Sequence, residues 1–229
     1  MNDQTDQQQT NPEVEAAAEQ AVDLGGDIKS AVRDITIQAL SKGKLDTDQI
    51  RNVVSAVVAG VTRGAQKSEG SSEEHQGGRV REALSGLDEA LASSAQASRL
   101  AIEEAAAQVG SLGGNEFKRA LDDLAALEGL FLNTVKEVAG STETRLKKTL
   151  TDFVDHAKIS GTAVGKAAAE CVSVLSKQLG NLLLEAASEG ADAALRVGAQ
   201  LSEVAAGLLD GIAGSLKARS EKNRENGGS

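Results

Sequence analysis

The chain has 229 residues and carries 24 Lys and Arg against 34 Asp and Glu, which gives a formal net charge of −10. With three Phe and no Trp or Tyr, it lacks the large aromatic side chains that fill a thick core. The acidic balance without a basic stripe argues against nucleic acid as a partner, because phosphate contacts need clustered Lys and Arg.

The N-terminal part is predicted to form a disordered tail followed by a small helical head. Residues 1–10 are polar, which is typical of a disordered tail. Asn11 and Pro12 match the cap and first-turn positions of a helix. Apolar residues at helical spacing then predict two more helices, the last with a continuous stripe of Val. We therefore expect a head of three helices over residues 11–66.

A flexible linker and a long helix are predicted next. Residues 67–78 contain no apolar residue and have the composition of a linker. Over residues 79–110, apolar residues alternate at spacings of three and four, which predicts one long helix. The seam of this helix changes from Leu to Ser and Ala partway along. Such small residues would let a neighbouring helix approach closely.

The last hundred residues carry an eleven-residue repeat. Counted from Phe131, the positions at offsets zero, four, seven and eight hold no charged residue over eight repeats. A repeat of eleven in three turns predicts a stripe almost parallel to the helix axis, with a faint right-handed supercoil. We expect one long helix over residues 115–220, with kinks at Gly140, Gly161 or Gly180.

The uncharged positions of this repeat form a seam that needs a partner. Roughly a hundred helical residues span about 150 Å, and such a helix cannot bury its own stripe unless it folds back. We expect a second copy of the chain as the partner, and a disordered tail over residues 221–229. The seam residues are Phe131, Val135, Val138, Leu146, Leu150, Phe153, Val164, Ala168, Cys171, Val172, Leu175, Leu179, Leu182, Leu183, Ala186, Gly190, Ala194, Val197, Leu201, Val204, Leu208, Ile212 and Leu216.

The sequence offers no constellation of catalytic or metal-binding residues. His75 lies in the predicted linker with no His or Cys nearby, and His156 lies on the charged side of the repeat. Cys171 falls on the seam, where a buried thiol is expected rather than a reactive one. We therefore predict that the protein is not an enzyme and has no catalytic, cofactor-binding or metal site and no small-molecule substrate.

The start of the chain is polar and acidic and shows no secretory signal. The sequence contains no run of 18 or more uncharged apolar residues of the kind that spans a membrane. We expect a cytoplasmic protein, and its association with a membrane or granule stays open. Pairs of small residues four apart, such as Gly161 and Gly165, allow close helix packing in lipid and in water alike.

Three segments resemble an uncharacterised bacterial family of alanine-rich helical proteins of unknown function. They are VRDITIQAL (Val32–Leu40), ALSGLDEALASSAQASRLAIEEA (Ala83–Ala105) and LDDLAALEGLF (Leu121–Phe131). The resemblance implies no activity. In composition alone, the chain is also similar to phasins, which coat polyester storage granules.

The sequence thus predicts an all-α protein with a small N-terminal helical head, followed by long helices that form a hendecad coiled coil or an elongated helical bundle. The favoured function is a homo-oligomeric scaffold or spacer. One alternative is an amphipathic coat on a lipid or storage-polymer surface. Another is a helical assembly that enters a membrane through about residues 161–216.

Overall fold

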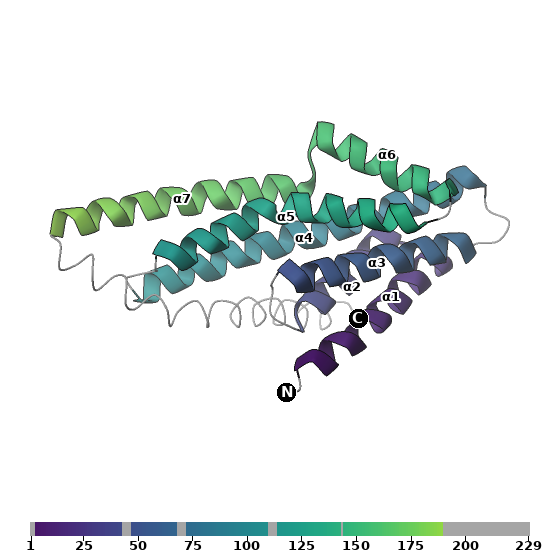
Figure 1. Ribbon diagram of the computed structural model, residues 1–229, viewed down its shortest axis with the longest axis horizontal. Coiled ribbons are helices and arrows are strands. Elements are labelled where there is room, and N and C mark those ends of the chain that lie inside the picture. Colours follow the sequence, from purple (N-terminus) through teal and green to yellow (C-terminus); the bar gives the residue numbers. More distant parts are fainter. Residues whose placement is uncertain (1–2, 43–46, 68–71, 110–113, 143, 190–229) are drawn as a thin grey trace.

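The computed structural model describes residues 3–42, 47–67, 72–109, 114–142 and 144–189. These residues form seven α-helices that pack side by side as an all-α bundle (Figure 1). The helices are α1 (Asp3–Leu24), α2 (Ile28–Leu40), α3 (Thr47–Lys67), α4 (Glu73–Val109), α5 (Gly114–Ser141), α6 (Thr144–Ser160) and α7 (Ala163–Glu189).

A glycine turn joins α1 to α2. Gly25 and Gly26 have φ angles of 74° and 83°, in the left-handed region where glycine carries no steric penalty and helices commonly end. Asp27 then caps α2, because its carboxylate accepts a hydrogen bond of 3.0 Å from the backbone N–H of Ser30. This hydrogen bond lowers the pKa of Asp27.

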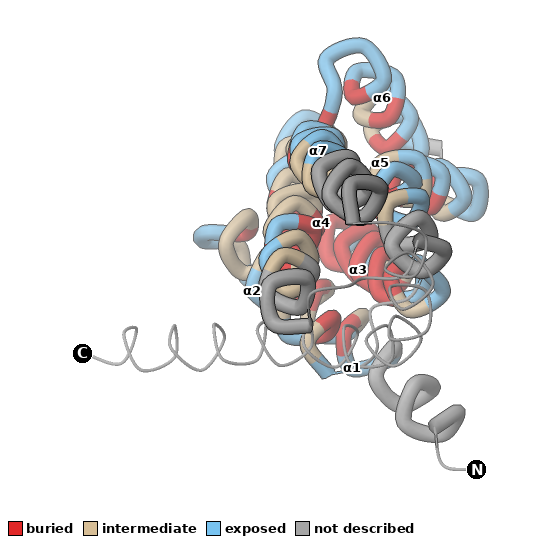
Figure 2. Tube along the Cα trace, turned by 90° about the vertical axis from the view of Figure 1, so that its left-hand side faces the viewer, coloured by how far each residue is buried: buried red, intermediate tan, exposed pale blue. Residues whose placement is uncertain are grey.

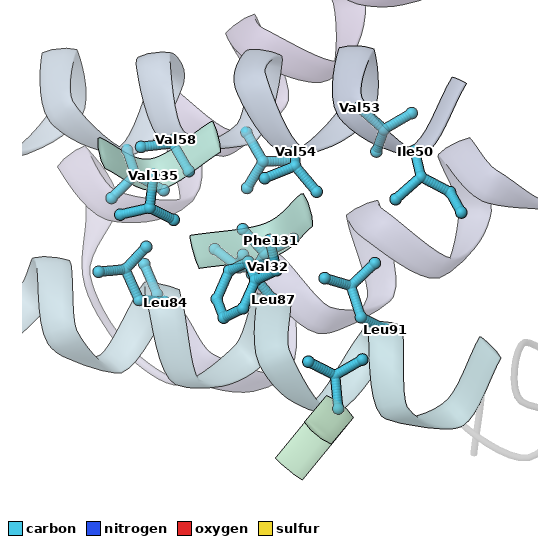
Figure 3. Close-up of a cluster of buried hydrophobic side chains, with 14 of the residues drawn as sticks. Val32, Ile50, Val53, Val54, Val58, Leu84, Leu87, Leu91, Phe131 and Val135 are labelled. Atoms are coloured by element: carbon cyan, nitrogen blue, oxygen red, sulfur yellow. The ribbon is translucent and has the colours of Figure 1, made fainter. Parts of the chain in front are cut away.

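One continuous apolar core joins all seven helices, from Val14 in α1 to Leu175 in α7. Its largest fully buried side chain is Phe131, whose ring meets that of Phe153 edge-on with the centroids 6.0 Å apart. Figure 3 shows Phe131 of α5 among Val and Leu side chains of α2, α3 and α4. The predicted head over residues 11–66 is therefore not a separate unit, since its helices share their core with the helices that follow.

Glycine lets helices of this bundle approach one another closely. A methyl group added at Gly60 of α3 would run into the backbone oxygen of Glu15 in α1, and one at Gly64 into that of Glu19. Gly86 of α4 is equally close to the backbone of α2. At these crossings the helix backbones themselves are in contact, so that small Ala and Val side chains suffice to fill the space around them.

Two helices begin earlier than the sequence predicted. α1 starts at Asp3, within the expected tail of residues 1–10, so that Pro12 lies inside the helix. α4 starts at Glu73, within the expected linker of residues 67–78. The Ser72 hydroxyl caps α4 by accepting a 3.3 Å hydrogen bond from the N–H of His75. Acidic residues in the first turn also suit the positive end of a helix. The polar composition of residues 73–78 is therefore compatible with the helix that they form.

The predicted single helix over residues 115–220 is wrong for the described part, which is divided into α5, α6 and α7. The chain turns after Ser141 and bends at Gly161, whose φ angle is 74°. α6 and α7 then follow α4 in the same direction, since Arg145 pairs with Glu73 and the N–H of Ala163 meets Asp88. Helices that fold back in this way bury the stripe on their own chain. Residues 190–220 and the tail over 221–229 lie outside the described residues.

α6 lies at the margin of the bundle (Figure 2). Its buried residues, which include Leu146 and Leu150, are on the side that packs against α5 and α4. The opposite side is exposed and carries Ile159, which is 88% exposed. The helix therefore contributes one face to the core and leaves the other to solvent.

The glycine crossing between α1 and α3 leads to a first prediction. Gly60→Ala is expected to lower the free energy of unfolding by about 1–3 kcal/mol, because the added methyl group forces the two backbones apart. Gly129→Ala is the matched control, since a methyl group there meets no atom within 4 Å and the helical position should gain about 0.5–1 kcal/mol. Urea unfolding followed by circular dichroism measures both, and equal effects of the two substitutions would contradict a close backbone contact.

Candidate functional site

The described residues of the predicted seam lie inside the chain's own bundle. The pattern identified the buried face, but the chain itself covers that face over this stretch. Eight of these residues are buried, namely Phe131, Val135, Leu146, Leu150, Val164, Ala168, Cys171 and Leu175, and three are partly buried against the core, namely Val138, Phe153 and Val172.

The rest of the predicted seam falls outside the described side chains. Leu179, Leu182, Leu183 and Ala186 belong to α7, but their side chains lie outside the described part. Gly190, Ala194, Val197, Leu201, Val204, Leu208, Ile212 and Leu216 lie wholly outside the described residues. For these positions, a contact with a second copy stays a prediction.

The Ser- and Ala-rich part of α4 receives α7, as its small residues indicate. The thiol of Cys171 donates a hydrogen bond of 3.5 Å to the backbone oxygen of Ala95. Burial raises the pKa of this thiol, so that Cys171 is kept in the unreactive protonated form. At the next turns, Glu103 lies 3.8 Å from Arg99 and 3.5 Å from the Gln178 amide. This contact is a closely packed helix interface that leaves the thiol little nucleophilic character.

Two carboxylates from different helices hold the start of α7, and we call this pair the acid clamp. Asp88 of α4 accepts hydrogen bonds of 2.7 and 2.8 Å from the backbone N–H groups of Ala163 and Val164. Glu128 of α5 accepts from the N–H and the hydroxyl of Thr162, at 3.1 and 2.7 Å. These N–H groups form the positive end of α7 and have no partner within the helix. The acid clamp thereby fixes α7 to both α4 and α5.

Burial is the main cause that raises the pKa of Asp88. The hydrogen bonds from Val164 and Ala163 act in the opposite direction, while the neighbouring charges of Glu128 and Glu89 raise the pKa further. Because this pKa is higher in the folded than in the unfolded chain, the folded chain binds the proton first as the pH falls. The stability that comes from this preferential protonation of Asp88 is therefore lost as the pH rises through the raised pKa, while the ionised carboxylate still accepts the two backbone hydrogen bonds.

A polar groove of about 480 Å³ lies between the glycine turn and the first turns of α4. His75 and Glu82 line it together with Arg79. The guanidinium of Arg79 donates hydrogen bonds of 2.8 and 3.3 Å to the backbone oxygens of Val22 and Asp23, and so caps the end of α1. The charged groups at this groove thus connect α1 to α4, and His75 lies in a helix rather than in a linker.

Among the residues that the structure describes, no group of three His, Cys, Asp or Glu side chains is placed to hold a metal ion. His156 is exposed on α6. Within the same described part, none of the helices is both long and apolar enough to cross a membrane.

Comparison with known protein families identifies the family of this chain. The model of a family described as a family of unknown function (DUF6781) matches residues 4–218. The match therefore covers the bundle and extends well past Glu189. No curated protein and no solved structure matches the chain.

The acid clamp leads to a prediction about stability. Asp88→Ala is expected to lower the free energy of unfolding by about 1–3 kcal/mol, because it leaves two N–H groups at the start of α7 without an acceptor. Asp88→Asn should cost less, since its amide oxygen keeps one acceptor and carries no buried charge. Urea unfolding at pH 7 measures both variants. If Asp88→Asn lowered the free energy of unfolding as much as Asp88→Ala, the retained acceptor would not stabilise the start of α7, contrary to the prediction.

The raised pKa of Asp88 leads to a separate prediction about pH. Relative to Asp88→Asn, the wild-type chain is expected to gain stability as the pH falls from 7 through the raised pKa, down to the ordinary carboxyl value of about 3.9. Parallel urea titrations of the two proteins at a series of pH values measure this difference. A wild-type advantage that shrinks on acidification would show that the backbone hydrogen bonds outweigh burial.

Proposed function

Because the chain belongs to the DUF6781 family of unknown function, as its sequence resemblance indicated, we propose its function from its architecture. The protein is a non-enzymatic interaction protein that joins copies of itself and serves as a scaffold or spacer. The bundle of α1–α7 forms the body of the scaffold. The part of the eleven-residue repeat that follows α7 makes the contact between copies.

One observation carries this proposal: among the described residues, the bundle buries the first part of the repeat, up to Leu175. Seam positions from Phe131 to Leu175 are buried or half-buried within the chain. The same uncharged phase continues after Glu189, and we call its large residues the C-terminal stripe: Val197, Leu201, Val204, Leu208, Ile212 and Leu216. Since the first part of the repeat packs helix against helix, we expect the C-terminal stripe to do the same against a second copy.

This proposal narrows the hendecad interface that the sequence first predicted. Positions from Phe131 to Leu175 are buried or half-buried within the chain, and we assign the coiled coil between copies to the repeat after α7, over residues 190–216. Residues 161–229 carry seven basic and eight acidic groups. Mixed charges in near balance suit helix pairing better than adsorption to an anionic surface.

A coat on a lipid or storage-polymer surface is the second candidate. The C-terminal stripe also favours this function, because an almost straight apolar stripe can lie flat on such a surface. A membrane-entering assembly through residues 161–216 is less favoured. It would require α7 to leave its contacts with α4 and α5 and to break the acid clamp at Asp88.

The proposal predicts a discrete oligomer that depends on the C-terminal stripe. Light scattering after size exclusion, with refractive-index detection because Trp and Tyr are absent, should give an oligomer for the wild-type chain. Leu201→Asp combined with Leu208→Asp should give a monomer, because two charges cannot be buried in an apolar contact. The matched control combines Ala199→Asp with Gln200→Asp, which adds the same charge off the stripe and should leave the oligomer intact.

Two outcomes would contradict this proposal. A wild-type monomer that gains helicity on liposomes or on hydrophobic particles would favour the coat. An oligomer that persists in the Leu201→Asp, Leu208→Asp variant would place the contact elsewhere on the chain.

A further inference from the structure

We propose that the far part of α4 is the surface that receives the C-terminal stripe of a second copy. This surface, which we call the α4 strip, consists of Ile37 at the end of α2 and of Ala97, Leu100 and Ala101 on α4. The inference rests on the proposed self-association and names the surface that takes part in it.

The α4 strip is an apolar patch separate from the main core. Ala97 is buried, and Ile37 and Ala101 pack against it half-buried, without joining the main core cluster. Beside them Leu100 is 54% exposed. Leu100 therefore extends this small apolar cluster to the surface of the bundle, where it offers an apolar contact to a partner.

Leu100 is exposed because α4 is longer than the helix that lies along it. α2 follows α4 in the same direction, since Lys29 pairs with Glu89 at 2.6 Å and Ile37 packs against Ala97. α2 ends at Leu40, whereas α4 continues to Val109. No described helix takes the place of α2 beyond that point, and Figure 1 shows α4, α5 and α7 extending past the ends of α1, α2 and α3.

The C-terminal stripe follows α7 in sequence, and α7 ends at this same end of the bundle. α7 runs parallel to α4, because Ala163 lies at Asp88, Cys171 at Ala95 and Gln178 at Glu103. The last residue of α7, Glu189, is therefore at the end of the bundle where α4 lacks its neighbour (Figure 1). When donor and acceptor lie at one end of a molecule, a twofold axis at that end satisfies both contacts and closes the assembly as a dimer.

The lengths favour a second copy over the chain's own strip. Even the whole stretch of α4 from Ala97 to its end at Val109 rises only about 18 Å, whereas residues 190–216, if helical, would span about 40 Å. Toward the other end, α2 carries the charged residues Lys29, Arg33 and Asp34, of which Lys29 pairs with Glu89 of α4. This stretch of α4 therefore matches less than half of one apolar stripe, and in a twofold dimer the rest of each stripe meets the stripe of the other copy.

A charge placed on the strip tests this inference. Leu100→Glu is expected to raise the dimer dissociation constant at least tenfold, measured by sedimentation velocity over a concentration series. Its melting temperature should stay close to the wild-type value at a concentration where both proteins are monomers, because the side chain is more than half exposed. Ile159→Glu and Leu24→Glu make the same change at residues that are 88% and 74% exposed, and they should leave dimerisation unchanged. Dimerisation of Leu100→Glu at wild-type strength, or equal weakening by the controls, would overturn the inference.

Disulfide cross-linking identifies which copy supplies the stripe. In a Cys171→Ala background, one tagged chain carries Leu100→Cys and a second, differently tagged chain carries Leu201→Cys. Refolded together and oxidised, they should form an interchain disulfide, whereas Lys148→Cys in place of Leu100→Cys should not. A disulfide that forms only within one chain bearing both Leu100→Cys and Leu201→Cys would overturn the inference, since the stripe would then dock on its own copy.

The two proposals fail in distinguishable ways. If the dimer is broken by Leu201→Asp with Leu208→Asp, but neither responds to Leu100→Glu nor forms the interchain disulfide, the α4 strip is wrong and self-association stands. If the wild-type chain is a monomer at all concentrations, both proposals are wrong.

Discussion

The structure depends on the close approach of helix backbones. A chain with three Phe and no Trp or Tyr has few side chains large enough to fill the space between helices at ordinary separation. Its helices instead come together where side chains are absent or small, at Gly60 and Gly64 against α1, at Gly86 against α2, and at Ala95 against Cys171 of α7. α4 contacts all six of the other described helices, so the bundle is organised around it. At each of these contacts the atoms of the two helices pack closely, so a substitution that adds volume there is destabilising.

Close packing also explains why polar side chains between the helices act as helix caps. A helix end brought against a neighbour loses water, so its free N–H or C=O groups need partners from that neighbour. The acid clamp of Asp88 and Glu128 supplies them at the start of α7, and Arg79 supplies them at the end of α1. Charged side chains that gather at these places are therefore helix caps from adjacent helices, and the chemistry they perform is recognition of backbone.

The sequence predicted which residues are buried better than it predicted where the helices end. The eleven-residue phase correctly marked Phe131, Leu150 and Leu175 as inward-facing, yet the chain turns after Ser141 and bends at Gly161. A repeat shows which face of a helix is apolar. A two-residue turn between two helices leaves the eleven-residue spacing unbroken when both helices bury that face against the same core. The acid clamp left no signal of its own, because Asp88 and Glu128 are single acidic residues on polar faces that only the bend at Gly161 brings to the start of α7.

The scarcity of large side chains also determines how any contact between copies is built. An interface usually gains most of its energy from a few large residues in deep pockets, but the C-terminal stripe has only Val, Leu and Ile, interspersed with Ala and Gly. Burial is worth roughly 25 cal/mol for each Å² of apolar surface, so small residues must add up over a long contact. An association of this kind stabilises the folded chain by mass action. The same repeat would then contribute to folding through its first part, which is packed within the bundle, and to assembly through its second part, whose contacts depend on protein concentration.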